Sequence, residues 1–176
     1  MDHADLISLG RALQGSVARA SSREAPAATR QGSDGHARLL AAFDFMVSHE
    51  ELVTASRSLF VDGYYARAVE EGLKALNNKV KRKSGLNDDG AQLMNTAFSP
   101  RQPILRLNRL KSRSDQDQQL GYMQILAGFM SGIRNPRAHE HDLDDSPDDA
   151  LAILGFVDHL FDVVEASTRT RRRKAP

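Results

Sequence analysis

The stretch from residue 64 to residue 85, YYARAVEEGLKALNNKVKRKSG, decides the fold class of this chain. Its apolar side chains recur at the spacing that lines one face of an α-helix: Tyr65, Val69, Leu73, Leu76 and Val80. Asp62-Gly63 predicts a turn before this helix. Gly85 predicts its end, because glycine accepts the left-handed backbone that closes a helix. We therefore expect a long helix with one buried face at the centre of the sequence.

Helices are also expected before this stretch. Residues 36–47 contain an apolar face made of Leu39, Leu40, Phe43 and Val47. The segment Ser48-His49-Glu50-Glu51 is typical of a capping box, and it predicts a second helix that runs to Phe60.

The helical pattern continues after Gly85. Residues 91–98 form a short apolar segment, a loop with two prolines follows, and a long helix is expected from about residue 115 to residue 133. Ser146 as N-cap and Pro147 at the first helical position predict the start of a last helix. No segment shows strand-like alternation of convincing length. The sequence therefore predicts an all-α bundle with four or five main helices.

The two ends of the chain differ from this pattern. Residues 1–35 contain a weak helical pattern over 2–18 and then a Ser-, Ala- and Gly-rich stretch that predicts a flexible linker. The folded domain is expected over residues 36–167. Residues 168–176 are rich in arginine and predict a basic C-terminal tail.

Composition excludes several classes of chemistry. The chain has 176 residues, which suits one domain, and it has no cysteine, so disulfides, thiolate nucleophiles and Cys-ligated zinc are excluded. The first residues are acidic where a signal peptide is basic, and no apolar run reaches membrane-spanning length. We therefore expect a cytoplasmic protein that does not enter a membrane.

Charge is segregated along the chain although the net charge is only +1. Basic residues gather at 79–83, 101–113 and 169–174, and acidic residues gather at 140–149. Such segregation makes an electropositive surface on a nearly neutral protein, but solvated helix ends and a disordered tail explain each cluster equally well.

Arg134-Asn135-Pro136-Arg137-Ala138-His139 is the most informative motif. Pro136 lacks an N–H and disfavours helical geometry at Asn135, so the long helix is predicted to end or bend there. In an unbroken helix Arg134 and His139 would point roughly 140° apart. A bend lets both side chains face one groove, and the Asn135 side chain is a candidate cap for the next turn.

A guanidinium and an imidazole suffice to cut RNA without a metal. RNA carries its own nucleophile, the ribose 2′-OH, and histidine moves protons near neutral pH. Arginine stabilises the charge that develops on the phosphorus. The alternative interpretation of this motif is a helix end at which Arg134 and His139 bind backbone carbonyls.

At these residues the chain resembles the HEPN superfamily, whose ribonucleases carry Arg-x(4–6)-His with a polar residue after the arginine. It resembles more closely the Ymh-type family of uncharacterised bacterial HEPN-like proteins. The resemblance covers residues 59–70, 75–80, 90–94, 97–100 and 128–140.

The resemblance implies a HEPN-like helical bundle that forms a homodimer with both motifs in one cleft. It implies a metal-independent endoribonuclease without cofactors, which leaves 2′,3′-cyclic phosphate and 5′-OH ends and acts as a toxin or in phage defence, where an antitoxin or a defence-complex protein is a possible partner. Arg134 and His139 are then catalytic, and Asn135 orients them. Glu70 or Glu71 is the candidate for an added acidic residue, although an ion pair with Lys74 explains Glu71 equally well.

Other interpretations remain open. A subset of HEPN toxins has a modifiable tyrosine two residues after the motif histidine, and this chain has His141 there. Several HEPN domains are inactive scaffolds.

His139-Glu140-His141-Asp142 suggests a metal, but neighbours two apart on a helix diverge and no third ligand cluster follows. A non-catalytic helical module that holds RNA or a protein partner is the main rival to the nuclease. RNA contacts are expected at Lys79, Lys81, Arg82, Lys83 and Arg137.

Overall fold

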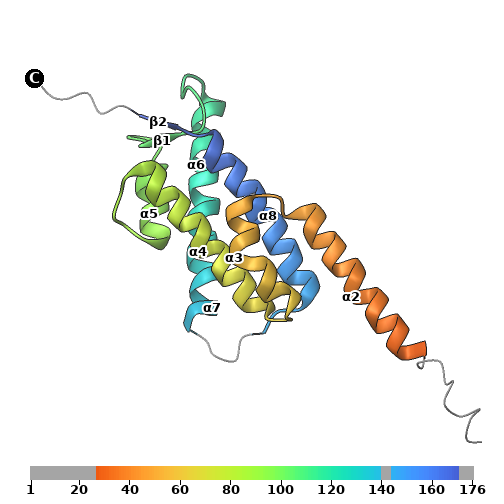
Figure 1. Ribbon diagram of the computed structural model, residues 1–176. Helices are drawn as coiled ribbons and strands as arrows, with labels where there is room; N and C mark the ends of the chain where they lie inside the picture. Colours follow the sequence, from red (N-terminus) through yellow and green to blue (C-terminus); the bar gives the residue numbers. More distant parts are fainter. Residues whose placement is uncertain (1–26, 140–143, 171–176) are drawn as a thin grey trace, which may run out of the picture. The chain divides into compact units, whose positions relative to one another are not determined.

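A computed structural model of the protein describes residues 27–139 and 144–170. Its elements follow one another as α2 (Ala27–Met46), α3 (Glu50–Val61), α4 (Tyr65–Ser84), α5 (Gly90–Ala97), β1 (Leu105–Arg106), α6 (Arg113–Gly128), the π-helical η1 (Phe129–Arg134), α7 (Asn135–His139), α8 (Pro147–Ala166) and β2 (Thr168–Arg169). The predicted all-α bundle is confirmed (Figure 1). The helical pattern over residues 2–18 lies outside the described residues.

Parts of the predicted linker and of the predicted tail belong to regular secondary structure, since α2 begins at Ala27 and β2 is formed by Thr168 and Arg169. Residues 27–35 form the first part of α2, because alanine, arginine and glutamine favour a helix even without a large apolar face. The bundle itself belongs to the compact unit that begins at Leu40. Among the described residues, no helix combines the length and the apolar character that crossing a membrane requires.

Helix α4 is the centre of the bundle and is contacted by α3, α5, η1, α7 and α8. Figure 1 shows it among these helices. Its predicted apolar stripe is buried at Val69, Leu73, Leu76 and Val80. Gly72 lies in the same face, where an added Cβ would come within 2.8 Å of Leu52 and 3.0 Å of Leu154. The missing side chain therefore allows α3 and α8 to approach α4 closely.

Several predicted helix boundaries are confirmed. Gly85 closes α4 with a left-handed backbone at φ 72°, and Gly63 in the turn before α4 has φ 83°. Ser146 caps α8, with its hydroxyl accepting a hydrogen bond from the Asp149 N–H at 3.1 Å, and Pro147 opens the helix.

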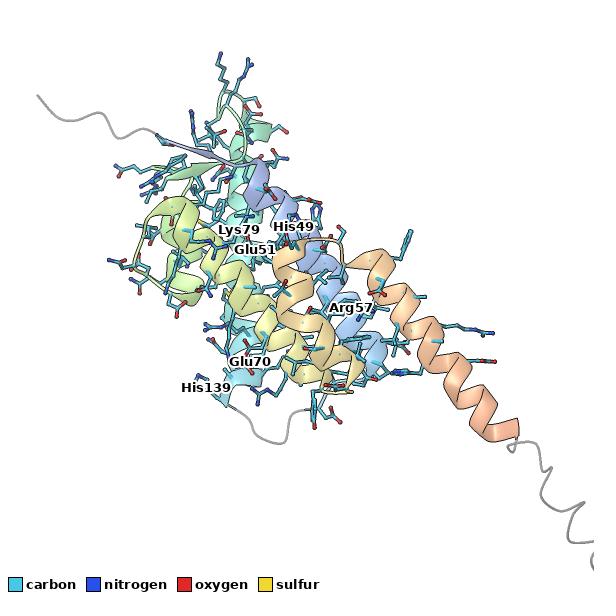
Figure 2. All side chains as sticks on the ribbon, viewed as in Figure 1. His49, Glu51, Arg57, Glu70, Lys79 and His139 are labelled. Carbon is cyan, nitrogen blue, oxygen red and sulfur yellow. The ribbon has the colours of Figure 1, made fainter. Side chains whose placement is uncertain are left out.

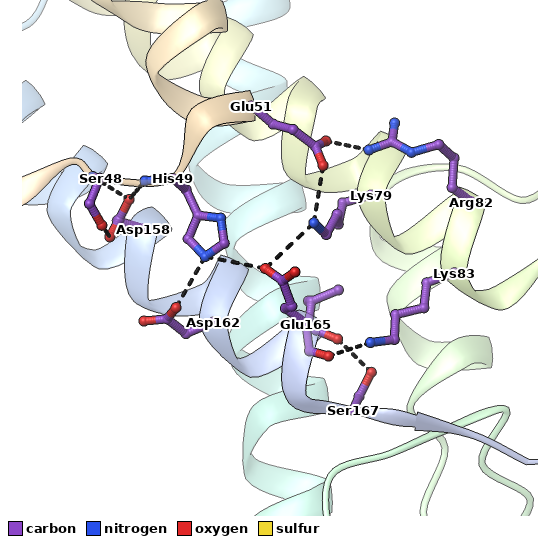
Figure 3. Close-up of polar contacts among 11 residues, drawn as sticks. Ser48, His49, Glu51, Lys79, Arg82, Lys83, Asp158, Asp162, Glu165 and Ser167 are labelled. Carbon is purple, nitrogen blue, oxygen red and sulfur yellow. Dashed lines mark hydrogen bonds and ion pairs between the residues drawn. The ribbon is translucent and has the colours of Figure 1, made fainter.

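The capping box predicted at residues 48–51 is wrong. Helix α3 begins at Glu50, and its N-cap residue His49 makes no side-chain capping bond. The free N–H groups of Ser48 and His49 instead donate to Asp158 Oδ1 on α8, at 2.9 Å and 2.8 Å, and the Ser48 hydroxyl reaches Oδ2 at 3.1 Å (Figure 3). A carboxylate from a distant helix therefore replaces the local cap.

A short β-ribbon was not predicted. Leu105 pairs with Arg169 and Arg106 with Thr168 in an antiparallel register. The buried side chain of Gln119 on α6 holds β1 in place, because its amide donates to the carbonyls of Phe98 and Leu105 and accepts from the Leu107 N–H, each at 2.9 Å. The first residues of the predicted basic tail are thus part of the fold.

Replacing Asp158 should destabilise the protein, because Asp158→Ala leaves two backbone N–H groups of the α3 start without an acceptor. We expect a loss of about 2–3 kcal/mol in the free energy of unfolding, measured by urea denaturation. Asp162→Ala is the control one turn along α8, since Asp162 is 70% exposed and its partner among the described residues is the His49 side chain at 3.1 Å. A loss at Asp158 no larger than at Asp162 would contradict the anchoring role.

Candidate functional site

The helix does not break at Pro136. It widens into the π-helical η1, where the Asn135 N–H donates to the carbonyl of Met130, and Asn135 itself is helical at φ −62° and ψ −44°. A proline ring in an α-helix clashes with the carbonyl four residues earlier, and a π-turn displaces that carbonyl. The predicted end of the helix at Pro136 is therefore wrong, since helical structure continues to His139, while the predicted bend stays a prediction.

Helix α7 continues from Asn135 to His139. Five residues of continuing helix leave the side chains of Arg134 and His139 pointing roughly 140° apart. Within one chain, the two motif residues meet different surroundings.

Arg134 lies against the start of α5. An added Cβ at Gly90 would be 3.8 Å from Arg134 Nη1, so the guanidinium passes beside the first residue of that helix. Its Nε atom is buried and has no hydrogen-bond partner among the described residues. A buried donor without an acceptor costs about 1–3 kcal/mol, which makes this atom a candidate contact for a ligand.

Asp89 is an acidic residue whose pKa is lowered by the charge of Arg134. The sequence analysis did not identify it. Asp89 caps α5 by accepting from the Gly90 N–H at 2.9 Å, and the same N–H reaches the buried Asn77 Oδ1 at 3.0 Å. Lys81 lies 3.7 Å from the carboxylate. Burial raises the pKa of Asp89, but the bonds from Gly90 and Asn77 and the charges of Arg134 and Lys81 outweigh it and hold that pKa below its ordinary value.

The cap at Asp89 could be found in the sequence, because an Asp-Gly pair precedes the apolar segment 91–98. Its position beside Arg134 depends on the packing of α5 against η1 and could not be found in this way.

His139 and Asn135 are both exposed on α7. Neither side chain forms a hydrogen bond with another described residue, although Glu140, next to His139, lies outside that set. Figure 2 shows His139 and Glu70 at the same end of the bundle, where α4 contacts α7. His139 is therefore accessible to a ligand or to a second chain.

The predicted acidic candidates on α4 are both paired with Lys74. Its ammonium lies 2.7 Å from Glu70 and 2.8 Å from Glu71. The ion-pair interpretation of Glu71 is thus confirmed. Only Glu70 is mostly shielded from solvent, with 12% of its side chain exposed. Its supporting role stays a prediction.

Most of the basic residues predicted to bind RNA are neutralised within the fold. Lys79 pairs with Glu51 at 3.0 Å, Arg82 pairs with the same carboxylate, and Lys83 donates to the backbone carbonyl of Glu165 (Figure 3). Burial alone would raise the pKa of Glu51, but the bonds from Lys79 and Arg82 lower it below the ordinary value. Lys81 faces Asp89, as described above.

Arg137 is used by the fold. Its guanidinium binds Asp145 through two hydrogen bonds, of 2.6 Å and 2.8 Å, and donates to the Ile133 carbonyl at 2.8 Å. Both side chains of the pair are only 10% exposed. Such a buried bidentate pair links α7 to the start of α8, so Arg137 is a structural residue here and its predicted RNA contact is untested. The metal suggested around His139 involves residues 140–142, which lie outside the described part.

These elements define the class of protein: an all-α bundle in which an Arg-x4-His motif follows a π-turn and borders a capped helix. A family model described as "Protein of unknown function (Hypoth_ymh)" matches residues 47–164, and the chain belongs to this family. Neither the curated proteins nor the solved structures contain a match to the chain.

The placement of Arg134 can be tested without any activity. Arg134→Gln removes a positive charge beside Asp89, so the pKa of Asp89 should rise toward its ordinary value; carboxyl titration by NMR measures it. Arg57→Gln is the matched control, because it should raise the pKa of Asp44 and leave Asp89 unchanged. An unchanged Asp89 in the Arg134 variant would show that the guanidinium lies elsewhere.

Proposed function

We propose that the protein is a metal-independent endoribonuclease of the HEPN type that acts as a homodimer. The observation that carries this proposal is the buried Nε of Arg134, which has no hydrogen-bond partner within residues 27–139 and 144–170 and belongs to the residue that the motif indicates. A guanidinium with a free, desolvated donor beside a helix start is suited to an RNA phosphate. The motif arrangement Arg134-x4-His139 and the resemblance to the superfamily support the same reaction.

The chemistry needs no group beyond these side chains and the RNA. The 2′-oxygen attacks the adjacent phosphorus while a neutral histidine takes its proton. The bond from phosphorus to the 5′-oxygen breaks, and a protonated histidine supplies the proton to that oxygen. Arg134 stabilises the charge on the phosphoryl oxygens, a contribution of roughly 10²–10³ in rate for one donor. The products are a 2′,3′-cyclic phosphate and a 5′-OH.

Two copies of the chain suit this reaction better than one. A single chain offers one motif histidine, and its side chain diverges from Arg134 by roughly 140°. In a homodimer that joins two α7 segments, His139 of one copy lies near Arg134 of the other, and two histidines share the acid and base roles. We place the activity in a toxin or phage-defence setting, where an antitoxin or a partner protein restrains it.

Purified protein should cleave labelled RNA in the presence of EDTA. We expect His139→Ala and Arg134→Ala each to lower the rate by at least about 10²-fold, because one removes a proton carrier and the other a charge stabiliser. An oligonucleotide with 2′-deoxyribose throughout should stay intact. Gel electrophoresis with end-group analysis of the fragments measures both the rate and the cyclic phosphate.

Two variants control for general damage. His159→Ala and Arg67→Ala remove an exposed histidine and an exposed arginine outside the motif, and should cleave like wild type. Cleavage that survives both motif substitutions would refute the assignment. A wild-type protein that binds RNA but never cleaves it would favour the non-catalytic module.

A further inference from the structure

The β1–β2 ribbon joins two basic segments that are far apart in the sequence. Residues 99–113 contain five lysines and arginines and no acidic residue, and residues 167–176 contain five more, again without an acidic residue. Pairing of Leu105 with Arg169 brings the two segments together. Among the described residues, Arg169 and the basic side chains of residues 99–113 therefore belong to one region of the fold.

Arg169 connects this surface to the end of α4. An added Cβ at Gly85 would lie 2.7 Å from Arg169 Nη2, so the guanidinium lies over the glycine that closes α4. Arg106, the neighbour of Leu105 in β1, has a buried Nε without a hydrogen-bond partner among the described atoms. The ribbon thus contains a second unsatisfied arginine donor besides that of Arg134.

The ribbon differs from the α4 cluster in its counter-charges. Lys79, Lys81 and Arg82 each have a carboxylate partner within the fold. By contrast, five of the six basic side chains described in these two segments form no ion pair within residues 27–139 and 144–170: Arg101, Arg106, Arg109, Lys111 and Arg169. The sixth, Arg113, pairs with Asp117 at 3.8 Å.

Asp115 is an acidic residue that Arg109 of this surface influences. The N–H groups of Lys111 and Ser112 already bind its carboxylate and hold its pKa below the ordinary value, and Arg109 contributes less. Asp115 closes the capping box of α6 with Ser112. The Asp115 carboxylate is therefore engaged by backbone N–H groups at the start of α6. The guanidinium of Arg109 thus stays available to an external anion.

We propose that the basic residues around the β1–β2 ribbon bind the phosphate backbone of single-stranded RNA. Guanidinium groups match phosphate in geometry and charge, and each contact releases counterions. This inference deepens the proposed function, because the ribbon holds the RNA whose cleavage Arg134 and His139 carry out.

The fold sets the distance between the ribbon and the motif. Gln119 fixes the ribbon to α6, and the helical run from Gln119 to Arg134 is about 22 Å long at 1.5 Å per residue. An RNA strand of several nucleotides can therefore contact the ribbon and extend toward the motif.

Fluorescence anisotropy with a labelled 20-nucleotide RNA tests this proposal. All proteins are full-length and carry His139→Ala, so that cleavage does not interfere. The ribbon variant is Arg101→Gln with Arg109→Gln and Arg169→Gln; the matched control removes the same charge through Arg38→Gln, Arg57→Gln and Arg67→Gln, three arginines outside the ribbon and outside the predicted RNA contacts. We expect the ribbon variant to lose roughly tenfold or more in affinity and its salt slope to shrink by about two, at about 0.7 per lost contact. The control should change less than twofold.

Three outcomes would overturn the proposal: no binding of RNA by the parent protein, an equal loss in both triple variants, or binding of vesicles with anionic lipids but not of RNA. Because cleavage is not measured, failure here leaves the endoribonuclease proposal standing. A protein that binds RNA through the ribbon but does not cleave it would support this proposal and contradict the endoribonuclease proposal.

Discussion

Burial of one face of α4 is the constraint on which the rest of the structure depends. The apolar positions of that face hold α3 and α8, and Gly72 allows both to come close. The same face also carries Asn77, which is buried and binds the start of α5 through the Gly90 N–H. Because α5 lies against η1, one helix determines both the core and the surroundings of Arg134. Changes in the α4 core are therefore expected to disturb the candidate site as well.

The π-turn before Pro136 is the second constraint. An inserted residue rotates everything after it by roughly 100° relative to a regular α-helix, so helical periodicity cannot be carried across it. The chain stays helical through Pro136, with Arg134 beside the start of α5 and His139 exposed. π-turns often occur at functional sites. Here the turn reconciles a proline with continuing helix.

The sequence predicted what depends on near neighbours and missed what depends on distant ones. Periodicity predicted the apolar face of α4, and local chemistry predicted the ends at Gly85 and Ser146, because those interactions lie within one turn. The cap of α3 failed because its acceptor, Asp158, is 110 residues away from Ser48. The β-ribbon has two residues per strand, which is too short for alternation to be visible.

The same distinction explains the site. Arg134 and His139 belong to a local sequence motif, so they could be identified as candidate site residues from the sequence alone. The position of Asp89 beside Arg134 follows from packing of α5 on η1, and the neutralisation of Lys79 and Arg82 follows from Glu51 on another helix. A count of basic residues ranks residues 79–83 as the best RNA contact, whereas the pairing of charges gives that rank to the ribbon.

The pairing of charges also bears on the proposed binding of RNA by a protein whose net charge is close to zero. Net charge is +1, so long-range attraction of the whole molecule is weak. A local surface still attracts phosphate if its own counter-charges are engaged elsewhere, as Asp115 is by the α6 cap. Near the ribbon Asp115 is engaged by the start of α6, whereas near α4 Glu51 is engaged by Lys79 and Arg82. The proposed RNA contact is therefore argued from the local pairing of carboxylates rather than from total charge.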